Sequence, residues 1–405
     1  MALEITDISG RVLTGTSVTI TGTDFGTKTT VEPLLWDDFQ AGTDDTALSD
    51  SPQIGTWSHI SGETPTPTKY STIYAHSGSQ CAYTPAHHTG YANIRVNNLT
   101  TANKLYWSFW FRFNNGGATG HQTKLMQLWG NGPDQCDYGP GVMSGGFTDS
   151  WFATYNIASG DDCDTGRIQE DYGFTPSQDT WQLAEMILER SSDYGVSDGT
   201  IIVKINNTTA YTHIGNILTR MSTSYGDQDW RSALFFYGFT NDDGLGSFAI
   251  DDVYFQDSWS RVELGNNAVY TNCTQRDIQR PTAWSNTSIT ISASEGGFSS
   301  NDTAYLFVID EDNAPSAGYE VTVGATLPVV STLQCEGETT PGAVADITPE
   351  FSTYVTKGTN NVSKIEIQVS ATDNFAGDLV YDSGSLDLDP VLTASGRTDN
   401  KSYGE

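Results

Sequence analysis

Two glutamates on one predicted strand, Glu185 and Glu189, are the first candidates for acid–base chemistry on a glycosidic bond. Residues four apart on a regular strand are separated by about 13 Å, at roughly 3.3 Å per residue. Retaining hydrolysis needs two carboxyl groups about 5–5.5 Å apart, and inverting hydrolysis about 6.5–9.5 Å. Position 187, between them, is Ile and supplies no third acid. The spacing therefore does not favour hydrolysis by this pair.

Elimination chemistry on a uronate would need a different set of side chains. A charge neutraliser and a base must both reach the sugar α-carbon, and Arg112 with Tyr155 or His121 supplies these residue types. However, Gln122 is followed by Thr-Lys, so the Gln-x-His strand motif of alginate-lyase-like jelly rolls is missing. A strongly acidic protein is also a poor host for polyanions. An enzyme therefore stays an alternative, and we lean toward a protein without catalytic activity.

Acidic loops supply hard oxygen ligands of the kind that suit Ca²⁺. The candidates are Asp162 and Asp164 in a glycine-rich loop, and Asp251 in the acidic pair at 251–252. The loop lacks a downstream bidentate Glu at the spacing of a calcium-binding loop. A structural Ca²⁺ is therefore a hypothesis, with solvated turn residues as the alternative.

Five cysteines leave one over if two disulfides form. Cys136 and Cys163 lie in two acidic, glycine-rich loops and are the best candidates for a bridge, with unpaired thiols as the alternative. The sequence has no CxxC spacing, so it carries no zinc or thioredoxin-type motif of that kind.

The charge balance excludes some partners. Fifty acidic residues against 19 basic ones give a formal charge of −31, and such a surface repels the phosphates of nucleic acids. The sequence contains no apolar run of about 18 residues, so we expect no membrane span. The first residues show no basic and apolar secretion signal. We therefore expect either that a signal was removed or that the protein leaves the cell by lysis, as a virion protein does.

The elements that must position these residues are strands. Apolar and polar residues alternate with period two in most patterned segments, and no stretch sustains a helical period. Such segments are residues 17–21, 105–113, 183–189, 201–205, 247–255, 288–292 and 364–369. Glycine, Asp, Asn and Ser punctuate them, so we predict an all-β fold built from sandwiches.

Strand alternation also assigns faces. In the segment 105–113, the Trp107 and Phe109 side belongs to the core, and the opposite side carries aromatic and polar residues. Flat rings stack on pyranoses, while amides and charges bind hydroxyl groups. We therefore expect a carbohydrate-binding face, with packing against another domain as the alternative. Its residues are Tyr106, Trp110, Arg112, Gln127, Trp129, Glu185, Glu189 and Lys204.

Two distant segments resemble the halves of one IPT/TIG immunoglobulin-like domain. The first contains Gly-Thr-Ser-Val-Thr-Ile-Thr-Gly-Thr-Asp-Phe-Gly at residues 15–26, close to the family signature GTxVTIxGxxFG. Residues 258–324 resemble its closing strands. Because 30 residues cannot bury a core alone, we predict one domain from 1–30 and 258–324, split by an insertion. Separate tandem domains are the alternative.

The inserted residues 31–257 resemble the concanavalin A-like jelly roll shared by lectins, polysaccharide lyases and glucanases. The resemblance rests on Tyr-Trp-Ser-Phe-Trp-Phe-Arg at 106–112, on the strand pair at 181–189 and 198–206, and on Phe-Ala-Ile-Asp-Asp-Val-Tyr-Phe at 248–255. It implies a jelly-roll sandwich and does not imply an enzyme.

The C-terminal residues divide into a predicted linker, 325–340, and a segment, 341–405, that resembles the first strands of a fibronectin type III-like domain. A sandwich of this kind needs about 90–100 residues. We therefore expect either further chain beyond this sequence or a strand supplied by a neighbouring subunit.

Three functions are compatible with this organisation. The first is a non-catalytic adhesin or fibre protein, extracellular or on a cell or virion surface, whose jelly roll binds polysaccharide. The second is a polysaccharide lyase or glycoside hydrolase using the same groove. The third is a structural filament or capsid subunit that self-associates. Architecture alone does not choose among them.

Overall fold

The computed structural model describes part of the chain, in short and long segments. These are residues 3–58, 68–85, 94–97, 102–114, 124–129, 138–144, 151–156, 167–174, 177–193, 196–217, 219, 232–237, 246–324, 329–335, 351–356, 364–365, 368–370, 379–382 and 386–387. They form β-strands and a short 3-10 helix, η2 (Tyr270–Asn272). The all-β prediction is confirmed. None of the described residues belongs to a helix long and apolar enough to cross a membrane.

The first of two facing sheets in the jelly-roll module contains eight strands. In pairing order they are β14 (Thr208–Ile217), β13 (Gly199–Ile205), β12 (Gln182–Glu189), β7 (Lys104–Asn114), β16 (Ser247–Gln256), β5 (Cys81–Pro85) and β4 (Lys69–Ser71), with β3 (Leu35–Asp37) also beside β16. All of their pairings are antiparallel. We call this the eight-stranded sheet.

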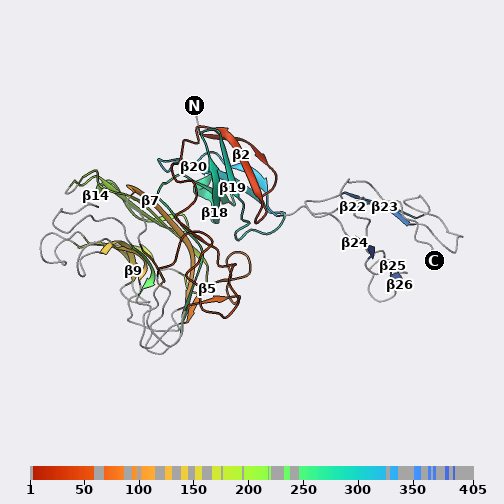
Figure 1. Cartoon of the computed structure of the whole chain (residues 1–405), viewed down its shortest axis with the longest axis horizontal. Helices are drawn as coiled ribbons and strands as arrows, with labels where there is room; N and C mark the ends of the chain where they lie inside the picture. The colour runs from red at the N-terminus through yellow and green to blue at the C-terminus, as the bar shows by residue number, and fades with distance from the viewer. Residues whose placement is uncertain are drawn as a thin grey trace. The chain divides into compact units, whose positions relative to one another are not determined.

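The second sheet has six strands and faces the first (Figure 1). In pairing order they are β11 (Arg167–Phe174), β10 (Trp151–Asn156), β9 (Tyr138–Ser144), β8 (Lys124–Trp129), β15 (Ser232–Tyr237) and β6 (Ile94–Asn97). The core lies between the sheets, where Phe235 meets Trp107 and Phe109 edge-on at centroid distances of 5.0 and 4.9 Å. The predicted core side of β7 is therefore confirmed.

The immunoglobulin-like module combines strands from both ends of the first 322 residues. In pairing order they are β1 (Glu4–Ser9), β2 (Ser17–Thr23), β19 (Ser288–Ser292), β18 (Arg276–Trp284), β17 (Arg261–Gly265), β20 (Thr303–Ile309) and β21 (Tyr319–Thr322). Figure 1 shows red β2 beside teal β19. The whole jelly-roll module lies between β2 and β17 in sequence, so the chain leaves this module and returns to it.

One strand joins the two halves of this module by changing partners. The first four residues of β18 pair with β17, and its later residues pair with β19. The change falls between Gln279 and Arg280, and the register with β19 shifts shortly after it, between Pro281 and Ala283. Proline has no backbone N–H to donate to a ladder and is tolerated at such bulges.

Residues 323–405 form a separate compact unit. Its described strands pair as β22 (Val329–Cys335) with β23 (Phe351–Thr356), β24 (Lys364–Ile365) with β27 (Leu386–Asp387), and β25 (Gln368–Ser370) with β26 (Leu379–Asp382). Strand β22 occupies seven residues of the predicted linker 325–340. The linker prediction is corrected accordingly, because the alternating Val-Ser-Leu-Cys side of this segment suits a paired strand.

Candidate functional site at the junction of the two modules

The immunoglobulin-like module covers the outer face of the eight-stranded sheet, where we predicted sugar contacts. Tyr106, Trp110 and Glu185 are 1%, 6% and 0% exposed. Glu185 forms an ion pair with Arg276 of β18, and Trp110 donates its indole N–H to Asp277 over 2.9 Å. These contacts contradict the predicted sugar-binding role of these three residues, and the packing alternative holds for them.

Three further predicted residues are half-buried on the same sheet. Arg112 stacks on the ring of Tyr74 at 3.8 Å and pairs with Asp179 at 2.7 Å. Lys204 lies opposite Glu185 in the register of β12 and β13, and burial lowers the pKa of its amine although Glu185 opposes this shift. Glu189 ends β12. These side chains do not form one open surface with the buried Trp110.

The remaining predicted residues are not on this face. Gln127 and Trp129 belong to β8 and hence to the six-stranded sheet, so β7 and β8 do not contribute to one surface. Their side chains lie outside the described part of the structure, as do Asp162 and Asp164 of the predicted calcium loop and the predicted disulfide pair Cys136 and Cys163.

A buried network of charges fastens the two modules together. The Arg276 guanidinium reaches Glu185 on the jelly roll and Glu263 on its own module, the latter at 2.5 Å. Arg261 pairs with Glu263 at 2.5 Å and lies 4.0 Å from the centroid of the Tyr106 ring. Burial alone would raise the pKa of Glu185, but Arg276 more than offsets this and holds it at about 2. The network therefore keeps ionised groups fixed at the junction.

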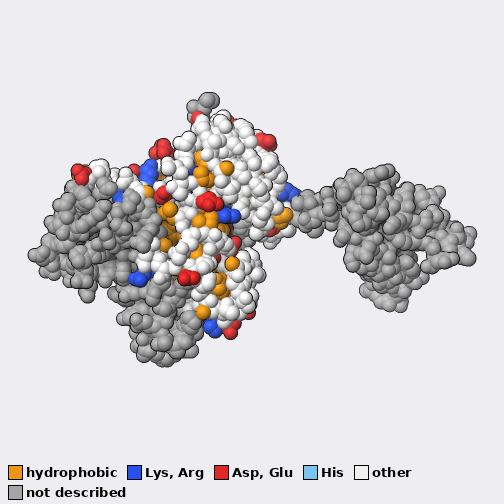
Figure 2. Space-filling view, viewed as in Figure 1, with side chains coloured by type: hydrophobic (Ala, Val, Ile, Leu, Met, Phe, Trp, Pro, Cys, Tyr) orange, Lys and Arg blue, Asp and Glu red, His pale blue; other side chains and the backbone are white. Residues whose placement is uncertain are grey.

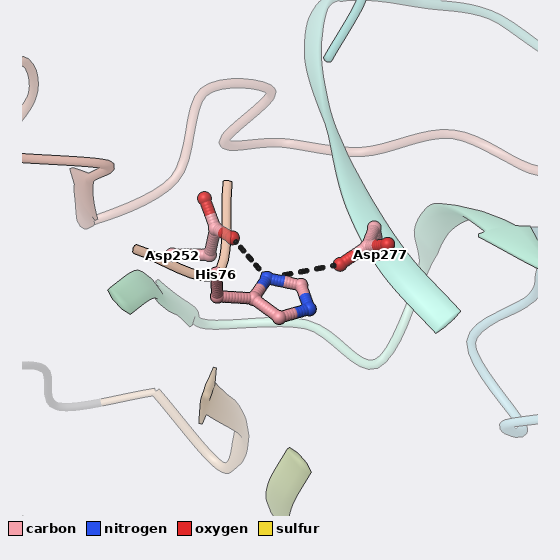
Figure 3. Close-up of side chains that lie close together, drawn as sticks. All are labelled: His76, Asp252 and Asp277. Atoms are coloured by element: carbon pink, nitrogen blue, oxygen red, sulfur yellow. Dashed lines mark hydrogen bonds and ion pairs between the residues drawn. The ribbon is translucent and has the colours of Figure 1, made fainter. Parts of the chain in front are cut away.

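Beside this network, one histidine is held between two aspartates of different modules (Figure 3). Nδ1 of His76 lies 3.0 Å from Oδ2 of Asp252 on the jelly roll and 3.7 Å from Oδ1 of Asp277 on β18. The His76 ring stacks on Trp110 with a centroid distance of 3.8 Å. We call His76, Asp252 and Asp277 the junction triad.

A bulge in β16 aims the triad's second residue. Asp252 has a φ of 49°, and the pairing of β16 with β7 shifts register between Asp251 and Tyr254. Bulges re-aim side chains and are frequent beside functional sites. The neighbouring Asp251 is fully buried and accepts the backbone N–H groups of His76, Ser77 and Asp252. Asp251 therefore fixes the loop that carries His76.

The electrostatics of the junction triad favour a charged histidine. Burial opposes the charged ring, but Asp277 and then Asp252 raise the pKa of His76 above its ordinary value. Burial also raises the pKa of Asp277, although His76 lowers it. An imidazolium over the face of an indole gains further from the cation–π interaction.

Each residue of the triad offers one atom that could bind a metal ion, and these atoms lie within 4.8 Å of one another. The hydrogen bonds favour a different assignment. The 3.0 Å separation of His76 Nδ1 and Asp252 Oδ2 is that of a hydrogen bond, and Oδ1 of Asp277 already accepts the Trp110 indole N–H. The triad therefore fits an ion-paired histidine better than a metal centre. Asp251, the predicted calcium ligand, has its hydrogen bonds to backbone groups.

An open cleft of about 320 Å³ lies next to the triad, between loops of the two modules. The jelly roll contributes Asp38, Gln40 and residues 76–78, and the immunoglobulin-like module contributes Thr14 and residues 294–298. Two hydrogen bonds join the residues that the immunoglobulin-like module contributes. The backbone N–H of Thr14 donates to the Glu295 carboxylate, and the backbone N–H of Glu295 donates to the Thr14 hydroxyl. The cleft exists only where both modules are docked.

One arginine on the six-stranded sheet also stands out. Arg95 lies between Ile94 and Val96, which are 0% and 5% exposed in the core, so alternation places Arg95 on the outer face. Its side chain is half-buried, and its Nε is shielded from solvent and has no hydrogen-bond partner among the described residues. A buried donor left unpaired costs about 1–3 kcal/mol, so this N–H group is poised to donate a hydrogen bond to a ligand oxygen.

Acidic side chains (red in Figure 2) are spread over the visible described surface rather than gathered in one patch. Candidate functional residues that the sequence analysis did not single out are His76, Asp277 and Arg95. The pattern Ile-Arg-Val at 94–96 was the available signal for Arg95.

Comparisons with known proteins assign the chain to no family. No family model and no curated protein matches it. Among solved structures it is similar to an endo-β-1,4-glucuronan lyase from the fungus Trichoderma reesei, with 13% identity and a TM-score of 0.40 over 49% of this chain and 90% of the other. It is similar to alginate lyase vAL-1 from Chlorella virus, with 11% identity and a TM-score of 0.34 over 47% and 89%. It is also similar to a GH131 β-glucanase catalytic domain from Podospora anserina, with 16% identity and a TM-score of 0.32 over 55% and 95%.

Proposed function

We propose that the jelly-roll module binds carbohydrate through the outer face of its six-stranded sheet, as part of a non-catalytic adhesion protein outside the cell or on a virion. The proposal keeps the ligand class expected from the sequence and moves the binding surface to the other sheet. The half-buried Arg95 with its unpartnered Nε is the observation that carries it.

The contacts between the modules support this choice of sheet. Among the described residues, the hydrogen bonds that link the immunoglobulin-like module to the jelly roll end on the eight-stranded sheet or its edge loops. Examples are Trp259 to the Leu188 carbonyl and Asn207 to the carbonyl of Tyr270. The docked module thus occupies one sheet and leaves the other as the face on which a ligand would bind.

The backbone register places further candidates in one row with Arg95. Arg95 pairs with Leu234, which pairs with Gln127 of β8. The row continues through Gly141 to Thr154. A glycine between polar positions leaves room for a ligand to approach the sheet closely. Guanidinium and amide groups are suitable donors to sugar hydroxyl and carboxylate oxygens.

The test is binding of the full chain to a glycan array, followed by affinity measurement on a positive polysaccharide. Arg95→Ala is expected to weaken binding about tenfold or more, because a hydrogen bond from a charged group contributes about 1.5–3 kcal/mol. Trp129→Ala is also expected to weaken it. Lys69→Ala removes one half-buried cation from the other sheet, as a matched control.

Unchanged affinity in both Arg95→Ala and Trp129→Ala would reject this surface. The same incubations distinguish the other functions. New unsaturated ends that absorb in the ultraviolet would show a lyase, new reducing ends a hydrolase, and either would refute a purely adhesive role. Self-assembly without glycan binding would favour the structural subunit instead.

A further inference from the structure

The cleft at the module junction has features of a second binding site that is separate from the six-stranded sheet. It is built by both modules and measures about 320 Å³. Small-molecule sites usually measure about 300–1,000 Å³, so the cleft suits a compact ligand such as one sugar ring.

One ring nitrogen of His76 is left for this cleft. Nδ1 is occupied by the two aspartates, and in Figure 3 both dashed lines end on Nδ1 and none on Nε2, the other ring nitrogen. His76 itself lines the cleft. The stack on Trp110 and the bond to Asp252 fix the ring, so Nε2 is a pre-oriented donor that needs little reorganisation to bind a ligand oxygen.

A glycine leaves space in the cleft beside Nε2 of His76. A Cβ on Gly297 would lie 2.9 Å from this nitrogen, so a larger residue would cover it. Glycine is common where a ligand approaches the backbone closely.

The charges of the cleft restrict what it accepts. Asp38 and Glu295 contribute carboxylates, and no Lys or Arg is among the described lining residues. The charge of His76 is already balanced by Asp252 and Asp277. Phosphate, sulfate and uronate groups would therefore be repelled. Carboxylate oxygens and an imidazole N–H instead suit the hydroxyl groups of an uncharged ligand, and the half-buried Phe298 offers an apolar ring for its C–H face.

We propose that this cleft binds one neutral pyranose ring, with His76 Nε2 donating to a hydroxyl oxygen and Asp38 and Glu295 accepting from hydroxyl groups. The site does not depend on the proposed function, because none of its residues lies on the six-stranded sheet. It predicts that sugar binding requires the two modules to be docked.

The experiment follows the imidazole nitrogens by NMR in the full chain labelled with ¹⁵N-histidine. The chain has six histidines, and His76→Gln identifies the His76 signals. D-glucose, D-galactose, D-mannose and N-acetyl-D-glucosamine are added in turn. At least one of them is expected to shift the Nε2 signal in a saturable way.

Gly297→Ala is the decisive variant, because its methyl group fills the space beside Nε2 and the position has no left-handed φ. It is expected to weaken binding about tenfold or more. Phe298→Ala gives a second route to the same loss if Gly297→Ala fails to fold. Ser300→Ala, exposed in the same loop, is the matched control and should bind as wild type.

Three results would overturn the proposal. They are the absence of a saturable shift with all four sugars, wild-type affinity in folded Gly297→Ala and Phe298→Ala, or a shift of the same signal by CaCl₂ alone that blocks the sugar. Arg95→Ala separates the two sites, since it should weaken polysaccharide binding and leave the His76 shift unchanged.

Discussion

Replacing Arg276 by Met should separate the energetics of the module junction from those of either core. Arg276 and Glu185 are 1% and 0% exposed, and Glu263 is 3% exposed. Arg276→Met keeps much of the side-chain volume but leaves buried Glu185 without its ion-pair partner and leaves Glu263 with Arg261 alone. Removing one member of a buried ion pair costs about 3–5 kcal/mol. The shift of the pKa of Glu185 from 4.5 to about 2 corresponds to about 3 kcal/mol, in agreement with that range.

Thermal unfolding of the full chain measures this loss. An unfolding entropy of about 2.1 cal/mol/K per residue gives roughly 1.5 °C per kcal/mol for a unit of this size, so the transition of residues 1–322 should fall by about 4–7 °C. Lys69→Met, which breaks an ion pair with the exposed Asp45, should cost under about 1 kcal/mol. The pKa of Glu185 is lower in the folded state, so its contribution is present above about pH 4.5 and is lost as the pH falls toward 2. The difference between wild type and Glu185→Gln should therefore shrink over that window. An Arg276→Met protein no less stable than the Lys69→Met control would refute this account.

Three further perturbations test other parts of the structure. The pKa of His76 is raised, so its contribution to folding stability is complete below about pH 6.5 and is lost as the pH rises through the raised value. His76→Gln should remove this decline in melting temperature between about pH 6 and 9. An identical decline in the variant would contradict the prediction. Burial raises the pKa of Asp37 to about 7 although Trp57 donates to it, so stability should fall as the pH rises from about 4 to 7, and Asp37→Asn should flatten that dependence in urea titrations. Trp259→Phe removes the 2.9 Å bond to the Leu188 carbonyl and should cost about 1–3 kcal/mol; an unchanged urea midpoint would contradict the assigned bond.

The period-two pattern was enough to predict the all-β fold and the core side of the segment 105–113. The predicted strand at 288–292 coincides with β19, and the one at 105–113 lies inside β7. The predicted side with Trp107 and Phe109 is in the core because alternation reports directly which side excludes water. These features depend on local residues, which is why they could be read from the sequence.

The outer side of β7 could not be assigned in the same way. A mixture of rings and polar groups is typical both of a sugar-binding surface and of an interface rich in hydrogen bonds. Tyr106 and Glu185 proved to belong to such an interface. The distinguishing information was in Arg261, Glu263 and Arg276, charged residues within strands more than 70 positions away in sequence, whose partners depend on tertiary structure. His76 was missed for the same reason, because its aspartates come from two different modules.

The insertion itself explains why one sheet is covered. Strand β16, an inner strand of the eight-stranded sheet, ends at Gln256 and β17 begins at Arg261. A connection of four residues therefore holds the end of β16 against the immunoglobulin-like module. Lys28 and Thr30, on the other connection, bond to Ser260 and Asp257. With both connections fastened at one place, the outer face of the eight-stranded sheet is the nearest surface for the module to cover. Charges such as Glu185 can be buried there because the module brings Arg276 to neutralise them. This docking leaves the other sheet, and the cleft that docking creates, for the two proposed binding surfaces.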